Sequence, residues 1–274
     1  MEVSSSGYYK WMKKIPSAQQ QRRELVIKEI KNVYEKSKRR YGSPRITSEL
    51  RKNNIKASQP FVAKLMRKEK IRSIIKKKFK VTTDSSHNYP IVENILMQDF
   101  TVKEHNKVWV SDLTYIPTAE GWLYLTTIID LFDRKVIGWA LSERMHASKT
   151  TIPAFKMALQ HRPMAEGKKL IFHSDRGIQY ACRDFVNEIS AYNIERSMSR
   201  KGNCWDNAVA ESFFKTIKVE LIYQNKYQTR KEAELSIFEY IEAWYNTNRR
   251  HKQLNNQTIN EFNQSIINNL KNAA

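Results

Sequence analysis

The sequence contains only two cysteines, Cys182 and Cys204, among 274 residues. Two thiols cannot build the disulfide framework of a small secreted domain, and they are too few for a cysteine-based zinc site. The six histidines are scattered along the chain without the close spacing of metal ligands. We therefore expect neither disulfides nor a zinc ion.

Long apolar runs are also missing. No stretch approaches the roughly 18 consecutive apolar residues that indicate a membrane-spanning helix. The first residues, MEVSSSGYYKWMKK, lack the apolar core of a signal peptide. These two absences predict a soluble, cytosolic protein.

Acidic residues are also relatively few. The sequence has 28 Asp and Glu against 48 Lys and Arg, which gives a net charge of +20. Residues 1–100 carry +15 of this excess, and the remaining 174 residues carry only +5. Such concentrated positive charge fits a partner with closely spaced phosphates, because each phosphate contact releases counterions. Nucleic acid is the leading candidate for this partner, and an anionic membrane surface is the alternative.

Residues 1–80 predict a helical DNA-binding domain. Apolar residues at helical spacing indicate a helix over residues 19–40. Ser43 and Ser58 are each followed by a proline within two residues, which predicts two short capped helices in a helix-turn-helix arrangement. A small helical bundle with an ordinary charged surface is the alternative. The second short helix carries the basic side chains that we expect to face DNA: Lys64, Arg67, Lys68 and Lys70.

The following segments predict a linker and then an α/β domain. Residues 81–105 are polar and are expected to form the linker. Three runs rich in β-branched and aromatic residues then predict an antiparallel meander, and the next segments alternate between helix and strand. The expected strands are 108–116, 121–133, 135–143, 168–175 and 194–199, and the expected helices are 146–162, 182–193 and 204–221. This order predicts a mixed sheet in an α/β layer.

The C-terminal part, residues 223–274, predicts one amphipathic helix over 229–254 that ends in a basic cluster. The Asn-rich residues after it are expected to be loosely ordered.

Three carboxylates are the candidate catalytic groups. Asp112 lies inside a strand, where an acid is costly unless a positive charge meets it. Asp175 ends the fourth strand, and Glu211 lies on the helix after the fifth. Each has an ordinary explanation as well: a buried hydrogen-bonded acid, a turn former or helix cap, and an i,i+4 ion pair with Lys215.

Together the three acids can converge on one point, where their charges repel unless cations neutralise them. Magnesium ions prefer oxygen ligands, and a pair of them can activate the attacking oxygen and stabilise the leaving oxygen of a phosphodiester.

Asp112, Asp175 and Glu211 are separated by 62 and 35 residues, a spacing that resembles the DD(35)E signature of transposases and retroviral integrases. The words HSDRGIQY, SMSRKGNCWDNAVAESFFKTIKVEL and YNTNRRHKQL are similar to those of the second-reading-frame transposases of frameshifting bacterial insertion sequences. This likeness runs from about residue 7 to residue 262.

The resemblance implies an RNase H-like integrase core over residues 106–222, with a five-stranded mixed sheet flanked by helices and an all-α helix-turn-helix-like domain in front. It implies that the three acids are catalytic and hold two Mg²⁺ or Mn²⁺ ions, with Asp112 bridging both. It also implies metal-dependent cleavage of double-stranded DNA at the inverted repeats of an insertion sequence, followed by strand transfer into target DNA.

The resemblance further indicates DNA contacts by Lys218, seven residues after Glu211, and by the nearby Lys215 and Lys201. For Arg249 and Arg250 it leaves two alternatives, contact with DNA or closure of the domain. The implied partners are further copies of the chain in a synaptic complex and a first-reading-frame product, bound or fused. The implied location is the bacterial cytoplasm, on the nucleoid.

Two other functions fit the same features. One is a non-catalytic DNA-binding regulator of transposition, and the other is an RNase H-fold nuclease that hydrolyses without joining. Metal-dependent nicking that Asp175→Asn abolishes separates the enzyme from the regulator.

Overall fold

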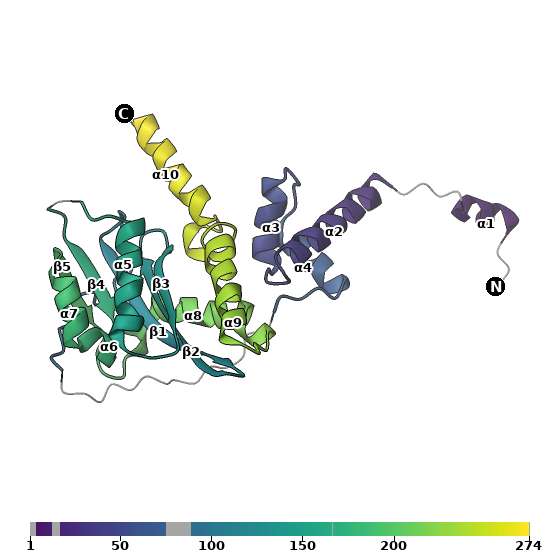
Figure 1. Ribbon diagram of the computed structural model, residues 1–274. Helices are drawn as coiled ribbons and strands as arrows, with labels where there is room; N and C mark the ends of the chain where they lie inside the picture. Colours follow the sequence, from purple (N-terminus) through teal and green to yellow (C-terminus); the bar gives the residue numbers. More distant parts are fainter. Residues whose placement is uncertain (1–3, 13–16, 75–88, 166, 274) are drawn as a thin grey trace. The chain divides into compact units, whose positions relative to one another are not determined.

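The computed structural model describes residues 4–12, 17–74, 89–165 and 167–273 (Figure 1). The chain divides into two compact units, Met1–Ile75 and Lys76–Ala274. Within the described ranges, no helix combines the length and the apolar character needed to span a bilayer.

The first unit is entirely helical, as the sequence predicts. Its helices are α1 (Ser5–Met12), α2 (Ala18–Lys36), α3 (Ser43–Lys52) and α4 (Gln59–Lys68). The last three share a small core of fully buried side chains, because each helix turns one apolar stripe inward. The central members of this core are Val26, Ile30, Ile46, Leu50, Val62 and Leu65.

The two short helices begin differently. The side chain of Ser58 caps α4 by accepting a hydrogen bond from the backbone N–H of Phe61 at 3.4 Å, which confirms this cap. The cap expected at Ser43 is wrong, because Gly42 occupies the cap position of α3 and Ser43 is already helical. Proline is tolerated throughout the first turn of a helix, so Pro44 did not fix the helix start to a single residue.

The second unit contains the predicted five-stranded mixed sheet. The strands are β1 (Val108–Thr118), β2 (Gly121–Asp130), β3 (Val136–Ser142), β4 (Leu170–Ser174) and β5 (Ile194–Met198), in the order β3-β2-β1-β4-β5. The first three pair antiparallel, whereas β4 lies parallel to β1 and β5 parallel to β4. This RNase H-like arrangement confirms the fold class.

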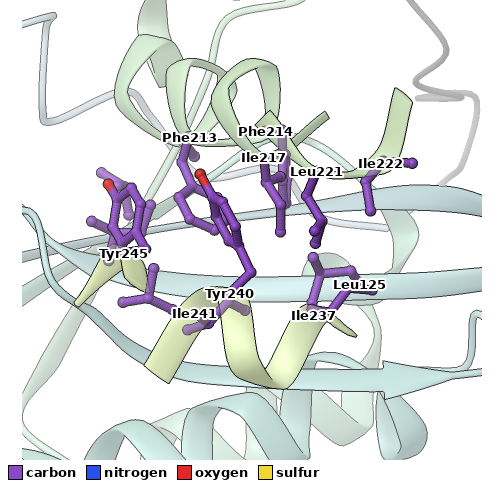
Figure 2. Packing of buried hydrophobic residues seen from close by; sticks show 14 of the residues in the cluster. Leu125, Phe213, Phe214, Ile217, Leu221, Ile222, Ile237, Tyr240, Ile241 and Tyr245 are labelled. Carbon is purple, nitrogen blue, oxygen red and sulfur yellow. The ribbon is translucent and has the colours of Figure 1, made fainter. Parts of the chain in front are cut away.

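Helices cover both faces of the sheet (Figure 1). Trp109 of β1 packs with α5 (Thr151–His161) and α7 (Arg183–Ser190), while Val108 and Val110 pack with α8 (Ala208–Glu220) and α9 (Arg230–Phe238). The division follows from the strand geometry, because successive side chains point to opposite faces. In Figure 2, apolar side chains of α8 such as Ile217 point toward those of α9 such as Ile237, which lies beside Leu125 of β2.

Gly138 on β3 allows α5 to lie directly on the sheet. A Cβ atom at this position would lie 2.1 Å from the carbonyl oxygen of Ala154 and 2.9 Å from Cβ of Ala158. We expect Gly138→Ala to lower the free energy of unfolding by about 1–3 kcal/mol, because the helix must move away from the strand. Chemical denaturation measures this change.

Lys156→Ala serves as the control, because Lys156 is exposed on the same helix α5 and its surface ion pair with Glu188 should contribute less than about 1 kcal/mol. Equal losses for the two variants would show that α5 adjusts freely to the extra methyl group.

The C-terminal part differs from its prediction. The single helix expected over 229–254 is wrong: α9 continues as a π-helical segment, Glu239–Tyr245, and the chain then turns. The loosely ordered tail is also wrong, because α10 (Ile259–Ala273) follows. Thr258 Oγ1 accepts from Glu261 N at 3.2 Å, and Thr258 N donates to Glu261 Oε2 at 3.0 Å. This capping box starts a helix whose Asn-rich composition alone does not favour one.

The linker expected over 81–105 is wrong in its second half, while residues 81–88 lie outside the described ranges. The backbone N–H groups of Ile95 and Leu96 donate to Ser197 Oγ at 2.9 and 3.3 Å, and Leu96 is buried in the core. The scattered apolar residues of this polar segment therefore anchor it to the second unit.

Candidate active site

Asp112 lies on the face of β1 that packs against α8. Its Oδ1 accepts a hydrogen bond from the backbone N–H of Leu113 at 2.8 Å. Burial among protein atoms raises the pKa of Asp112 well above its ordinary value, the negative charges of Asp175 and Glu211 raise it further, and Lys218 opposes these effects. The site thus places Asp112 where its charge is costly unless a cation is near.

Asp175 follows the last residue of β4, beside Asp112. Val110 of β1 pairs with His173 of the parallel strand β4, and each acid lies two residues beyond this pair. Oδ1 of Asp175 accepts from the backbone N–H of Gly177 at 2.9 Å, which holds the carboxylate over the turn. Strand register therefore brings the two aspartates together, as the sequence predicts for neighbouring strand ends.

Glu211 enters the site from the first turn of α8. Partial desolvation raises its pKa, and the charge of Asp175 raises it further, while Lys215 lowers it. The residue before α8, Asn207, donates from Nδ2 to the carbonyl oxygen of Ser111 at 2.9 Å. The helix that carries Glu211 is thereby tied to the strand residue preceding Asp112.

Three protein-family models match the chain: an HTH-like domain over residues 20–79 and two integrase core domains over 102–204 and 192–258. An insertion element IS600 protein of 31 kDa from Shigella sonnei is 41% identical, over 93% of this chain and 92% of its own. Transposase InsF for insertion sequence IS3A, from Escherichia coli K12, is 39% identical over 92% of this chain and 87% of its own. The chain belongs to the IS3 family of insertion-sequence transposases.

Two solved structures are also similar to this transposase. The catalytic domain of Mos1 mariner transposase aligns with a TM-score of 0.44 and 14% identity, over 50% of this chain and 71% of its own. The HTLV-2 integrase catalytic core in complex with magnesium aligns with a TM-score of 0.40 and 17% identity, over 57% and 94%.

Family membership and the integrase core confirm the predicted enzyme class, a polynucleotidyl transferase of the DDE type.

Lys218 of the transposase, for which contact with DNA stays a prediction, lies beside Asp112. It is buried, its Nζ lies 5.8 Å from the centre of the Tyr115 ring, and burial lowers its pKa while Asp112 raises it. Lys218 therefore lies inside the site as the cationic neighbour of Asp112, and it does not project toward solvent.

The other residues expected on DNA fall into two groups. Lys215 is exposed beside Glu211, Lys201 is exposed in the loop before α8, and Lys64, Arg67 and Lys68 are exposed on α4, whereas Lys70 lies just beyond its end. Arg249 and Arg250 are buried instead, in ion pairs with Glu220 and Glu261 at 2.9 and 3.0 Å. The structure therefore favours domain closure for these two arginines, because buried paired guanidinium groups are not available to phosphates.

The hydrogen bonds that Ser111, the residue before Asp112, makes in the core were not identified from the sequence. The Tyr180 hydroxyl lies 2.8 Å from Ser111 Oγ, which itself donates to the carbonyl oxygen of Thr127 at 2.9 Å. Burial raises the pKa of Tyr180 well above its ordinary value, and the charges of Asp112 and Asp175 raise it further. A serine next to an aspartate in a strand carries no local signal of such a role.

A tighter cluster of possible metal ligands lies elsewhere, formed by His105, Asp130 and Asp133, whose ligand atoms all lie within 4.8 Å of one another. The guanidinium group of Arg162 bonds both carboxylates. Because the guanidinium group already neutralises the two carboxylates, we interpret this cluster as a structural ion-pair network at the end of β2 and not as a metal site.

Gly177 makes room for the Asp175 carboxylate. A Cβ atom on Gly177 would lie 2.9 Å from Asp175 Oδ1 and 3.0 Å from Gln179 Oε1. If Asp175 is catalytic, Gly177→Ala should reduce the cleavage rate by about tenfold or more, because a displacement near 1 Å at a catalytic group can cost a hundredfold. The unfolding midpoint should change little, since a side-chain oxygen can move aside. Gel-based nicking assays and thermal unfolding of the same preparations measure both effects, and an unchanged rate would contradict this role of Gly177.

Proposed function

We propose that this transposase cleaves DNA at the ends of its insertion sequence and joins the freed ends to target DNA, with Asp112, Asp175 and Glu211 as catalytic residues. The observation that carries the proposal is the convergence of carboxylates from β1, from the end of β4 and from α8. The pKa values of Asp112 and Glu211 are raised in part by the charge of the neighbouring acids. Structural acids are usually paired with cations instead.

The donor set fits two divalent cations. Carboxylate oxygens are the ligands that Mg²⁺ and Mn²⁺ prefer, and the mutual repulsion of the acids favours a bound cation. Asp112 would contribute to both ion sites, with Asp175 and Glu211 each contributing to one. When bound, the ions supply charge neutralisation for the phosphodiester and activation of the attacking oxygen.

The residues of the chain prepare this site before any ion binds. The N–H groups of Leu113 and Gly177 orient the two aspartates, and the bond from Asn207 to β1 fixes the start of α8. Lys218 favours the ionised form of Asp112, which is the form that can bind a cation. The proposed contribution of the protein is thus positioning and charge, without a covalent enzyme intermediate.

DNA binding is proposed for the exposed basic side chains. Lys64, Arg67 and Lys68 on α4 would contact the terminal repeats, and Lys201 and Lys215 would contact phosphates near the acids. Copies of the chain would assemble on paired ends, with the first-reading-frame product as a partner or as a fused segment.

The test is a strand-transfer assay on labelled duplexes that end in the flanking repeats of the element, with Mg²⁺ or with chelator. We expect nicked and joined products only with the metal, from the chain alone or from its fusion to the first-frame product. Binding of the ends by both proteins without nicking or joining would support the non-catalytic regulator. Hydrolysis without joining would support the nuclease.

A further inference from the structure

The turn before α8 is held in place by hydrogen bonds to Asp206, and one of them comes from Gln98, in the segment before β1. Asp206 is fully buried, and its carboxylate accepts from the backbone N–H and from the guanidinium group of Arg200, both at 2.8 Å. The side-chain amide of Gln98 donates to the same carboxylate at 2.7 Å. Together with the bond from Asn207 to β1, these contacts fix the 3₁₀ turn Cys204–Asn207 at both ends.

Trp205 projects from this fixed turn. Its backbone N–H donates to Asn203 Oδ1 at 3.1 Å, but its side chain is 70% exposed, the largest fraction among the large apolar side chains of the described residues. Within those residues, no aromatic ring stacks on the indole. A tryptophan can bury 150–250 Å² of surface, so a rigidly mounted and open indole is typical of a binding group.

The segment that carries Gln98, on the other side of the bond to Asp206, also exposes a large apolar side chain. Met97, the neighbour of Gln98, is the second most exposed large apolar side chain in the described ranges, at 66%. Met97 and Gln98 both adopt left-handed backbone conformations, with φ of 49° and 64°. Each such residue costs about 1 kcal/mol, and strain of this kind is concentrated at ligand clamps and active sites. Both segments therefore hold an apolar side chain in solvent, and the segment that carries Met97 does so in a strained backbone conformation.

We propose that Trp205 is a stacking platform for an unpaired nucleobase at the DNA end. This inference rests on the proposed function. The turn is tied to the residue before Asp112 and opens the helix that carries Glu211, so a strand that reaches the acids passes close to it. Lys201 supplies positive charge for the adjoining phosphates, whereas the guanidinium group of Arg200 is already paired with Asp206, and every base offers a flat face to an indole.

The test compares the full chain with Trp205→Ala and Trp205→Phe in the joining assay, on paired duplex ends and on ends with one abasic position at a time. We expect Trp205→Ala to lower the joining rate on the paired end by about tenfold to a hundredfold, as loss of one base stack does. Trp205→Phe should stay within a few fold of wild type. Phe238→Ala is the control, because Phe238 is a 54% exposed aromatic on α9.

The abasic series identifies the base. At the stacking position, the abasic substitution should slow the wild-type protein to the rate of Trp205→Ala and should not slow Trp205→Ala further. Equal rates for wild type and Trp205→Ala, or the same additional loss at every abasic position, would overturn the proposal.

A binding measurement keeps the two proposals separate. With 2-aminopurine placed at each end position and chelator present, we expect quenching at one position that Trp205→Ala abolishes. If the wild-type protein neither nicks nor joins, the catalytic proposal fails, and the quenching still decides the stacking. Quenching that Trp205→Ala leaves unchanged would overturn the platform.

Discussion

Asp175→Asn should reduce metal-dependent nicking and joining by at least about a thousandfold, while binding of the DNA ends is retained. The same result is expected for Asp112→Asn and Glu211→Gln. Each substitution keeps the shape of the side chain and removes the charge that would hold a divalent ion. Timed assays in Mg²⁺, together with electrophoretic mobility shifts of the same duplexes in chelator, measure the two properties separately.

Stability supplies an independent readout for Asp112. A carboxyl whose pKa is raised on folding binds its proton more strongly in the folded protein, so its charge opposes folding at neutral pH. In chelator, Asp112→Asn should therefore unfold at the same or a higher temperature than wild type. Mg²⁺ should raise the midpoint of the wild type only, because the variant has lost a ligand.

Asp184→Asn is the matched control, since Asp184 is exposed on α7. Full activity of Asp175→Asn, or equal losses for the control, would remove the three acids from the mechanism.

Arg249→Met should lower the free energy of unfolding by about 3–5 kcal/mol, because it leaves the buried carboxylate of Glu220 without its cation. The guanidinium group bonds Glu220 through Nε and a terminal nitrogen, and Tyr240 donates to the same carboxylate at 2.9 Å. Urea denaturation followed by fluorescence measures the change.

Lys252→Met is the control, as this exposed cation should contribute less than about 0.5 kcal/mol. The double variant Arg249→Met with Glu220→Gln should recover part of the loss, because the uncompensated charge is gone. A loss of less than 1 kcal/mol for Arg249→Met alone would indicate that Glu220 reaches solvent or another donor.

The placement of the two aspartates could be predicted because strand patterns are local and neighbouring strand ends meet at one edge of a sheet. The helix that carries Glu211 could be predicted from its apolar spacing, while the catalytic role of the three acids stays a prediction. The burial of Lys218, Arg249 and Arg250 could not be predicted, because a basic residue looks the same in sequence whether it faces solvent or a buried carboxylate. Their acidic partners are distant in sequence or lie among other acids, so the sequence does not identify the pairs. These partners are Asp112, Glu220 and Glu261.

The hydrogen bond from Gln98 to Asp206 escaped prediction for a related reason. Gln98 and Asp206 are 108 residues apart, and Gln98 lies in a polar segment that reads as a linker. Hydrogen bonds between distant irregular segments leave no periodic pattern. The α10 cap was a different case, since Thr258 and Glu261 form a recognisable T-x-x-E pattern that the Asn-rich composition obscured.

The origin of the three acids in separate elements has a consequence during synthesis. Asp112 and Glu211 lie 99 residues apart, and Glu211 is supplied by α8, which follows all five strands of the sheet. A polypeptide released early by the ribosome, or clipped by a protease between β4 and α8, would keep the basic front unit and both aspartates but no glutamate. Under the proposed mechanism such fragments lack one of the three acids, so only molecules whose translation has passed α8 can cleave DNA.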